Sequence, residues 1–310
     1  MAIIRNLASM MLKGKIGDTT YYVSQSRQLA RQALNNSNYG ETASRTDVQQ
    51  TRRVRWANLV NFYSGNKAWM KKAFENLKPG VSIFNRFMQL NLPAADVALT
   101  KAQAQAKTWV VTPLKVSQGS LPSISPTVYG DGNQSTLELT TTIGEATTVA
   151  QVSQNIIANN PAMADGDAIV CVTFEGTYSA PLGTSNVRPA TYIYSEFVLN
   201  TADERLMSAA YPKWVVVENY FANQDTDGAT AFVYIHTRKA SGKLYVSTET
   251  IVTLPDDDTS IPEWKDAAQL AAAIASYGEA TSVPLAPGGS SSQQSGSDSS
   301  SGGDGSGSLE

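Results

Sequence analysis

Two residues of this chain have side chains that readily act as a catalytic base or a nucleophile, the single His236 and the single Cys171. His236 lies in the strand-like stretch YIHTRK, in which alternation places it beside Arg238 on one face. Cys171 lies in the apolar stretch AIVCVTF, which is typical of a buried, unreactive thiol. These residues form no recognisable catalytic arrangement, so we interpret His236 as a packed or surface side chain and expect no enzyme. A single cysteine also excludes an intrachain disulfide and a thiolate metal cluster.

The run NQDTDG at residues 223–228 imitates the first half of a calcium-binding loop. Asn223, Asp225 and Asp227 stand at positions one, three and five of such a loop and are the candidate metal ligands. Position twelve would be Tyr234, where the loop needs a bidentate glutamate, and strand-like stretches flank the run. We therefore favour a turn rich in Asp and Asn over a calcium site. Neither a dinucleotide fingerprint nor a phosphate-binding glycine-rich loop occurs, and we expect no cofactor.

Basic and aromatic residues are mixed in the stretch DVQQTRRVRWANLVNF, which begins at Asp47. On a helix its apolar side chains form one stripe, made of Val48, Trp56, Leu59, Phe62 and Tyr63. Arg52 and Arg55 fall inside this stripe, whereas Arg53 lies well outside it. Arginines inside an apolar stripe must snorkel or meet carboxylates, because an unpaired buried charge is costly. The pattern favours a protein interface, with ordinary solvated arginines and a nucleic-acid contact as the alternatives.

Charge divides the chain into a basic and an acidic part. Residues 1–107 carry 16 Lys and Arg against 5 Asp and Glu, whereas residues 108–310 carry 8 against 22. This asymmetry predicts a basic docking module at 1–107 and head-to-tail contacts between copies, and hence a homo-oligomer. Arginines would meet carboxylates of the partner and apolar side chains would fill its pockets. The expected contact residues are Arg27, Arg31, Arg52, Arg55, Trp56, Leu59, Phe62, Trp69 and Phe74.

The elements of residues 1–107 are expected to be a β-hairpin followed by helices. Gly14 and Gly17 indicate a turn, and Thr19 to Val23 indicates a strand. Ser44 and Asp47 fit a capping box, so a helix should begin near Thr46, end at Tyr63 and be broken by Ser64-Gly65-Asn66. Three further helical stretches are predicted, at residues 67–77, 82–92 and 94–107.

From Trp109 onward the pattern changes to β-branched and aromatic stretches separated by Gly, Pro, Asn and Asp. The predicted strands lie within 109–116, 136–142, 168–176, 191–199, 213–221, 230–238 and 243–254. Lys239 to Gly242 should form a short hairpin turn, and helices are predicted at 149–158 and 263–277. The expected fold is α+β, with an antiparallel, immunoglobulin-like β-sandwich over residues 108–278 and a disordered Ser/Gly-rich tail over 279–310.

The sequence also bears on the compartment. It has no run of about 18 apolar residues, so no membrane span is expected. The apolar stretch in MAIIRNLASMMLKGK is too short and too interrupted for a secretory signal. We therefore expect a soluble protein made inside a cell, with no membrane contact.

Several motifs occur together in this chain. The N-terminal ones are MAIIRN, KGKIGDTTYY, a T-x-x-Q-x-x-x-R pattern at Thr46, Gln49 and Arg53, and AFENLKPGVSIFNRFMQLN. They are followed by LKVSQGSLPSI and by AFVYIHTRKASGKLYVSTETIV. In this order they resemble an uncharacterised family shared by Bacteroidetes bacteria and their phages, and the virion structural proteins of crAss-like phages. The resemblance covers most of residues 1–277, and its motifs carry no established chemistry.

What the resemblance implies is a structural role in a phage virion, after synthesis in the host cytoplasm. The implied places are a head fibre, an auxiliary capsid protein, or a ring or connector of the neck and tail. The implied partners are capsid, portal, ring or fibre proteins. Two other classes stay open: a packaged protein that binds nucleic acid through residues 1–107, and a carbohydrate-binding module for host attachment. The second would use exposed aromatics drawn from Tyr192, Tyr194, Trp214 and Tyr220.

Overall fold

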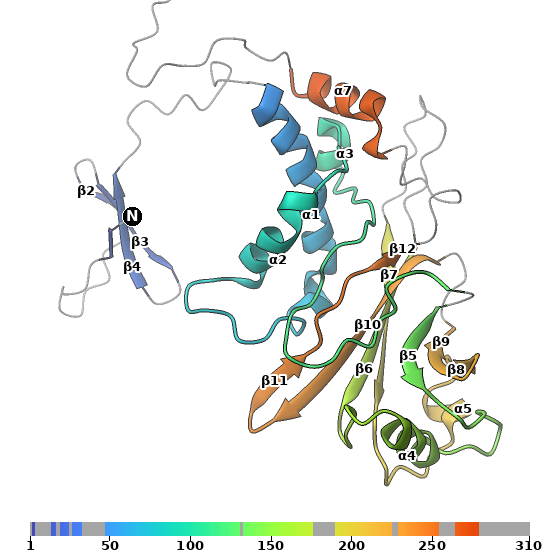
Figure 1. Cartoon of the computed structure of the whole chain (residues 1–310). Helices are drawn as coiled ribbons and strands as arrows, with labels where there is room; N and C mark the ends of the chain where they lie inside the picture. Colours follow the sequence, from blue (N-terminus) through green and yellow to red (C-terminus); the bar gives the residue numbers. More distant parts are fainter. Residues whose placement is uncertain are drawn as a thin grey trace, which may run out of the picture.

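The structure is a computed structural model that describes most of the chain outside its termini (Figure 1). The described residues are 2–3, 14–16, 19–24, 27–32, 47–130, 133–175, 190–224, 229–253 and 264–278. Within them the protein is a mixture of helices and antiparallel sheets, with a helical module, as the sequence predicts. The predicted disordered tail lies outside the described residues, as does Ser44 of the predicted capping box.

The N-terminal residues form a sheet of their own, with the strand order β1-β4-β3-β2. Its strands are β1 (Ala2–Ile3), β2 (Gly14–Ile16), β3 (Thr19–Ser24) and β4 (Arg27–Gln32). Strands β3 and β4 pair antiparallel along their whole length, from Thr19 opposite Gln32 to Ser24 opposite Arg27. This confirms the strand predicted at Thr19 to Val23 and the expected hairpin.

Helix α1 (Asp47–Met70) is one continuous helix of 24 residues, so the predicted break at Ser64-Gly65-Asn66 and the separate helix at 67–77 are wrong. Gly65 does not end the helix; it lets Trp109 approach closely. A Cβ added at Gly65 would lie only 2.7 Å from Trp109 Nε1. The glycine therefore serves packing at this position, although it lowers helix propensity.

Asn66 does not end the helix either, because its buried side chain is satisfied inside it. Its Nδ2 donates to the carbonyl of Phe62 at 2.9 Å, and its Oδ1 accepts a hydrogen bond from Trp69 Nε1 at 3.0 Å. An asparagine with both polar groups engaged one turn away in each direction has no need to cap the helix.

Shorter helices follow. Helix α2 (Ile83–Asn91) begins after Ser82, whose hydroxyl accepts from the amide of Asn85, and confirms the helix predicted at 82–92. The 3₁₀ turn η1 (Leu92–Ala94) comes next. Helix α3 (Lys101–Gln105) is much shorter than the predicted helix at 94–107, because Thr100 and Gln103 form a capping box that starts it late.

Residues 109–116 were predicted to be a strand, and this is wrong: they belong to none of the three sheets, and Lys115 forms a single antiparallel bridge with Thr250. Backbone hydrogen bonds join residues 114–116 to residues 249–251, and asparagine side chains supply further hydrogen bonds to this segment. Asn58 bonds both polar groups of Val110, accepting from its amide at 2.8 Å and donating to its carbonyl at 3.1 Å. Asn91 does the same for Lys115, with both distances near 2.9 Å. Pro113, between them, has no amide to donate to a ladder.

The larger sheet has five strands in the order β11-β10-β6-β7, with β12 beside β10. Its strands are β6 (Ala168–Glu175), β7 (Thr191–Val198), β10 (Ala229–Ala240), β11 (Lys243–Val246) and β12 (Val252–Thr253). The predicted hairpin between β10 and β11 is confirmed. Its turn has Ser241 at φ 50° and Gly242 at φ 72°, the left-handed pair that a tight two-residue hairpin needs.

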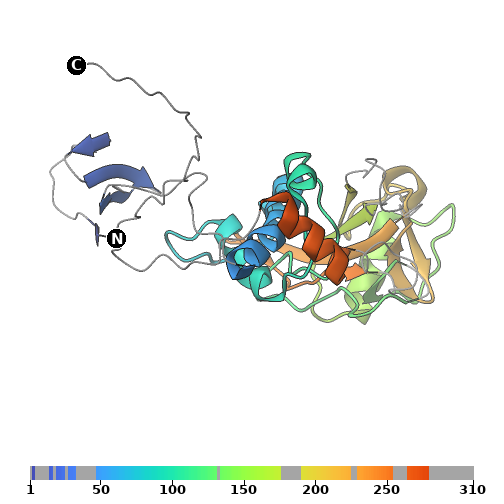
Figure 2. The same cartoon turned by 90° about the horizontal axis from the view of Figure 1, so that it is seen from above.

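The smaller sheet has three strands, β5 (Gln134–Glu138), β8 (Trp214–Val217) and β9 (Tyr220–Asn223), in the order β5-β9-β8. The stretch 213–221, predicted as one strand, is therefore two strands that turn at Glu218 and Asn219, whose φ angles are 47° and 67°. Helix α4 (Val149–Asn159) confirms its prediction, and α5 (Met207–Ala210) is short. Helix α7 (Ala267–Ser276) lies across α1 (Figure 2).

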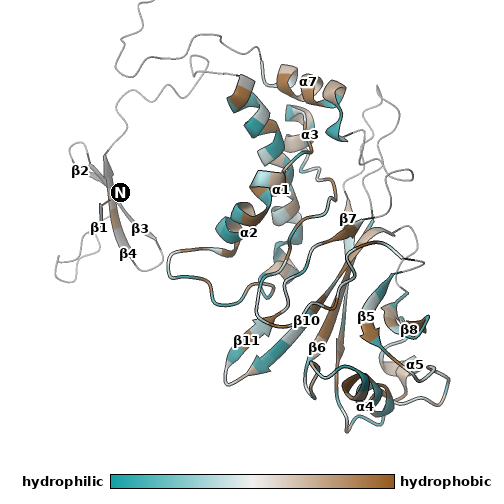
Figure 3. Ribbon diagram, viewed as in Figure 1, coloured by the Kyte–Doolittle hydropathy of each residue, from teal (hydrophilic) through white to brown (hydrophobic). Residues whose placement is uncertain are grey.

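Both faces of the central strands are buried, which places the five-stranded sheet between two cores. Along β6, Val170, Val172 and Phe174 pack toward the helices, with Phe62 and Trp69 of α1. The alternate residues, among them Ile169 and Cys171, pack toward the smaller sheet and α4. Figure 3 shows the resulting apolar run along β6. The thiol of Cys171 is buried, as expected from its setting.

The core beneath α1 also includes the sheet face formed by Ala231, Val233 and Ile235 of β10. The helical layer therefore shares a core with the sheet across the proposed boundary at residues 107 and 108. The division into a module at 1–107 and a domain at 108–278 stays a prediction. None of the helices in the described part of the chain has the length and hydrophobicity of a membrane span.

Candidate protein-docking surface

The predicted stripe of α1 is divided between solvent and core. In its first half, Val48 is 62% exposed and Trp56 is 42% exposed. In its second half, Leu59 and Phe62 are buried, at 1% and 0% exposure, in the core that α1 shares with α2 and the sheet. The other elements cover this side of the helix from Leu59 onward and leave its first turns open.

Four of the predicted contact residues are not available as contacts. Leu59, Phe62, Trp69 and Phe74 all lie in the chain's own core, so in the folded protein their side chains are not available to a partner. Trp69 further donates its indole N–H to Asn66. The sequence pattern marks these residues as apolar but does not distinguish an internal neighbour from an external one.

The arginines of α1 are placed differently from the prediction. Arg52 and Arg53 are both exposed, and Arg55 is half-buried. The expected contrast between Arg52 inside the stripe and Arg53 outside it is therefore absent. The charge of Arg53 acts on Tyr277 after α7: burial raises the pKa of this phenol, and the nearby guanidinium partly offsets the rise.

Arg55 stands out among the three because its Nε is buried and has no hydrogen-bond partner within the described part of the chain. The ion pairs found there are Arg205–Asp203, His236–Asp167, Arg238–Asp167 and Lys265–Asp96, and none includes an arginine of α1. A half-buried guanidinium without a carboxylate is costly and would be stabilised by an acidic partner. At about 100° per residue, Val48, Arg52, Arg55 and Trp56 lie on one side of α1, and we call this side the α1 face.

Arg27 and Arg31 belong to strand β4 of the N-terminal sheet, opposite Ser24 and Thr20. Their side chains lie outside the described part of the structure, so their role stays a prediction.

Asp167 anchors a buried polar cluster that sequence alternation partly predicts, since His236 and Arg238 reach it from the same face of β10. His236 Nε2 lies 2.8 Å from Asp167 Oδ2, and Arg238 contacts both carboxylate oxygens at 2.7 Å. Burial favours a higher pKa for Asp167, but the hydrogen bonds from Arg238, His236 and the amide of Ala164 outweigh it and lower the pKa to about 2. The cluster therefore holds a stable carboxylate.

His236 itself is fully buried, which confirms the interpretation as a packed histidine. Its second ring nitrogen, Nδ1, is buried and has no partner within the described residues. A catalytic dyad would need a nucleophile or a substrate at this nitrogen, and neither solvent nor a hydroxyl reaches it here. The geometry suits an ion pair that fastens the loop before β6 to β10.

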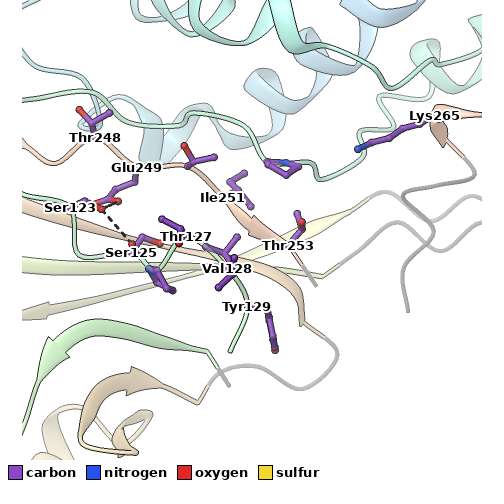
Figure 4. Close-up of a pocket in the computed structure, with 14 residues that line it drawn as sticks. Ser123, Ser125, Thr127, Val128, Tyr129, Thr248, Glu249, Ile251, Thr253 and Lys265 are labelled. Carbon is purple, nitrogen blue, oxygen red and sulfur yellow. Dashed lines mark hydrogen bonds between the residues drawn. The ribbon is translucent and has the colours of Figure 1, made fainter. Parts of the chain in front are cut away.

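A groove of about 730 Å³ lies between the sheet and the segment 123–129 (Figure 4). Its floor includes Glu249, which accepts hydrogen bonds from the hydroxyl of Ser123 at 2.6 Å and the amide of Ile124 at 2.9 Å. Burial raises the pKa of Glu249, and these donors partly offset the rise. Both carboxylate oxygens accept hydrogen bonds from the chain, so Glu249 holds the segment at Ser123 and Ile124 in place.

Two other predicted features are only partly described. Asn223 is a buried residue at the end of β9, whereas Asp225 and Asp227 lie outside the described residues. The calcium loop therefore stays a prediction. Of the aromatics considered for carbohydrate binding, Trp214 is buried in the core and Tyr194 is 39% exposed. Tyr192 and Tyr220 are half-buried.

Comparisons of this chain with models of protein families, with curated proteins and with solved structures find no match.

Proposed function

We propose that this chain is a non-enzymatic structural protein of a phage virion, which docks onto an acidic surface of a neighbouring virion protein and also oligomerises. The observation that carries the proposal is the α1 face, where Trp56, Val48 and Arg52 are exposed and the Nε of Arg55 has no partner among the described residues. The excess of basic residues over 1–107 supports an acidic partner. The sequence resemblance supports a place in a virion, as a head fibre, an auxiliary capsid protein or a ring of the neck and tail.

In this proposal the partner supplies what the α1 face lacks. A carboxylate would meet the accessible part of the Arg55 side chain, and an apolar pocket would receive Trp56. A tryptophan offers about 150–250 Å² of surface, of which 42% remains exposed here. Burying that remainder at about 25 cal/mol per Å² contributes about 2 kcal/mol, or about 30-fold in affinity. The β-rich part would act as an immunoglobulin-like sandwich that faces outward or toward the next copy.

The test is to incorporate variants into phage particles and to measure their amount relative to the major capsid protein by mass spectrometry. We expect Trp56→Ala and Arg55→Ala to reduce incorporation by about 10-fold or more. Val128→Ala, at an apolar residue that is 71% exposed outside the helical layer, and Arg53→Ala are the matched controls and should leave incorporation unchanged. Equal losses for Arg55→Ala and Arg53→Ala, or a wild-type chain that is absent from particles, would overturn the proposal.

Nucleic-acid binding is the second candidate, and the exposure of both Arg52 and Arg53 on one helix favours it. Phosphate contacts make such binding steeply dependent on salt. The full chain should show no duplex DNA binding tighter than about 1 μM at physiological salt, because non-specific binding is weaker than that. Tighter, salt-steep binding that is lost in an Arg52→Ala, Arg53→Ala double variant would favour the second candidate over protein docking.

A further inference from the structure

Strand β7 forms one edge of the five-stranded sheet. All eight of its residues pair with β6 in an unbroken antiparallel register, from Thr191 opposite Glu175 to Val198 opposite Ala168. In the part of the chain that the structure describes, no strand pairs with its other side. Every second residue of β7 therefore directs its backbone N–H and C=O groups outward, where they lack a strand partner.

Within the described residues, this edge is long and regular, and Glu196 is the one charged side chain on it. Natural edge strands are kept short, bent by bulges, or protected by lysine or proline. The opposite edge follows this rule, since β11 has four residues and begins with Lys243, opposite Ala240. Strand β7 is twice as long, contains neither lysine nor proline, and exposes Tyr194 and Val198, at 39% and 38%. Such a strand is a ready template for another strand.

We propose that β7 pairs antiparallel with β7 of a second copy, so that the two five-stranded sheets join across a two-fold axis. A two-fold axis perpendicular to the sheet leaves the same face of both copies on the same side of the joined sheet. Residues of β7 whose side chains lie on the same face therefore oppose each other. With the axis at Ser195, Tyr194 of each copy lies opposite Glu196 of the other. Cross-strand neighbours of this kind are about 5 Å apart, within reach of a phenol and a carboxylate.

The chain itself argues for a second copy as the occupant. Within one chain the Tyr194 hydroxyl already donates to Glu196 Oε2 at 3.0 Å, so the two groups are suited to each other. Glu196 is the one charged residue of β7, and in this register it does not oppose its own counterpart. The two Glu196 carboxylates therefore do not face each other across the axis. The contact contains two equivalent pairs, each of Tyr194 from one copy with Glu196 from the other. The inference refines the oligomerisation of the proposed function by naming the contact between copies.

The test is the mass of the purified full chain by sedimentation velocity, from about 1 to 100 μM, the range in which a modest interface is populated. The wild-type chain should be a dimer at the upper end. Tyr194→Lys places on this edge the kind of charge that protects natural edges, and should weaken dimerisation by about 30-fold or more. Val128→Lys is the matched control, since Val128 is 71% exposed and lies outside β7, and should dimerise like the wild type.

Hydrogen exchange locates the contact independently of the variants. Amides of residues 191–198 should exchange more slowly at about 100 μM than at about 1 μM, whereas those of β11 should not change. A monomer at all concentrations, or a dimer that Tyr194→Lys leaves intact, would overturn the inference. Trp56→Ala should leave the dimer unchanged, so a failure of docking in particles and a failure of β7 pairing are separate results.

Discussion

The replacement of Asn58 by alanine tests whether an asparagine side chain holds the backbone at Val110 in place of a neighbouring strand. Asn58 is 2% exposed and bonds both the amide and the carbonyl of Val110. Alanine at this position leaves both buried backbone groups without partners. Each unsatisfied group costs about 1–3 kcal/mol, so the expected loss for two groups is about 2–6 kcal/mol of unfolding free energy.

Helix propensity works in the opposite direction, because alanine is favoured over asparagine by about 0.6 kcal/mol within a helix. The control for this effect is Asn85→Ala, also in a helix, at an exposed residue whose side chain makes no hydrogen bond in the described structure. The difference between the two variants isolates the hydrogen bonds to Val110. Urea unfolding, followed by circular dichroism, gives the free energy if the slope with urea stays constant.

The expected result is that Asn58→Ala unfolds at a clearly lower urea concentration than the wild type, and that Asn85→Ala unfolds within about 0.5 kcal/mol of it. A difference below about 1 kcal/mol between the two variants would refute the reasoning, because the backbone of Val110 would then have to find other partners easily.

Other predictions concern packing, charge and docking. Gly65→Ala should destabilise the protein by about 1 kcal/mol although alanine favours helix, because its Cβ meets the Trp109 indole; stabilisation in a melting experiment would contradict the packing argument. Asp167 has its pKa lowered to about 2, so it stabilises the fold by about 2 kcal/mol above pH 4, and this is lost as the pH falls from 4 to 2. Asp167→Asn should therefore unfold with a shallower pH dependence over that interval, as urea midpoints at pH 7, 3 and 2 would measure. In particles, Arg55→Ala should reduce incorporation more than Arg53→Ala, as described above.

Periodicity predicted the elements that are determined by local pattern. The stretch AIVCVTF has uninterrupted apolar and β-branched residues and is the strand β6, buried on both faces. The helix at 149–158 begins at a capping box of Thr148 and Gln151, and such a local signal needs no tertiary information. The left-handed turn at Gly242 was equally visible, because a two-residue hairpin requires residues that tolerate positive φ.

The failures lie where a distant neighbour decides the outcome. Gly65 appears as a helix stop in the sequence, and only the position of Trp109, far along the chain, turns it into a packing site. Residues 109–116 have strand propensity, but asparagine side chains bond the backbone at Val110 and Lys115, and residues 114–116 meet residues 249–251 through a short antiparallel bridge. Hydrogen bonds from asparagine side chains to a distant backbone leave no periodic pattern in the sequence of the helices or of residues 109–116.

The candidate site shows the same limit. The projection of α1 placed Val48, Arg52, Arg55 and Trp56 on one side of the helix, but it could not show which of them are exposed or where the cover over that side begins. Leu59 and Phe62 continue the same stripe into the core. Sequence periodicity gives the direction of a side chain, whereas its burial depends on where α2 and the sheet end.

The double burial of β6 and β10 restricts how this protein can acquire new binding properties. Substitutions along these strands disturb one of two cores, so few of them are compatible with folding. Variation in recognition is therefore confined to the periphery, to residues such as Trp56 and Tyr194 that contribute little to either core. In related chains that bind different partners, we expect substitutions to accumulate on the α1 face and on the outer side of β7, with the central strands changing least.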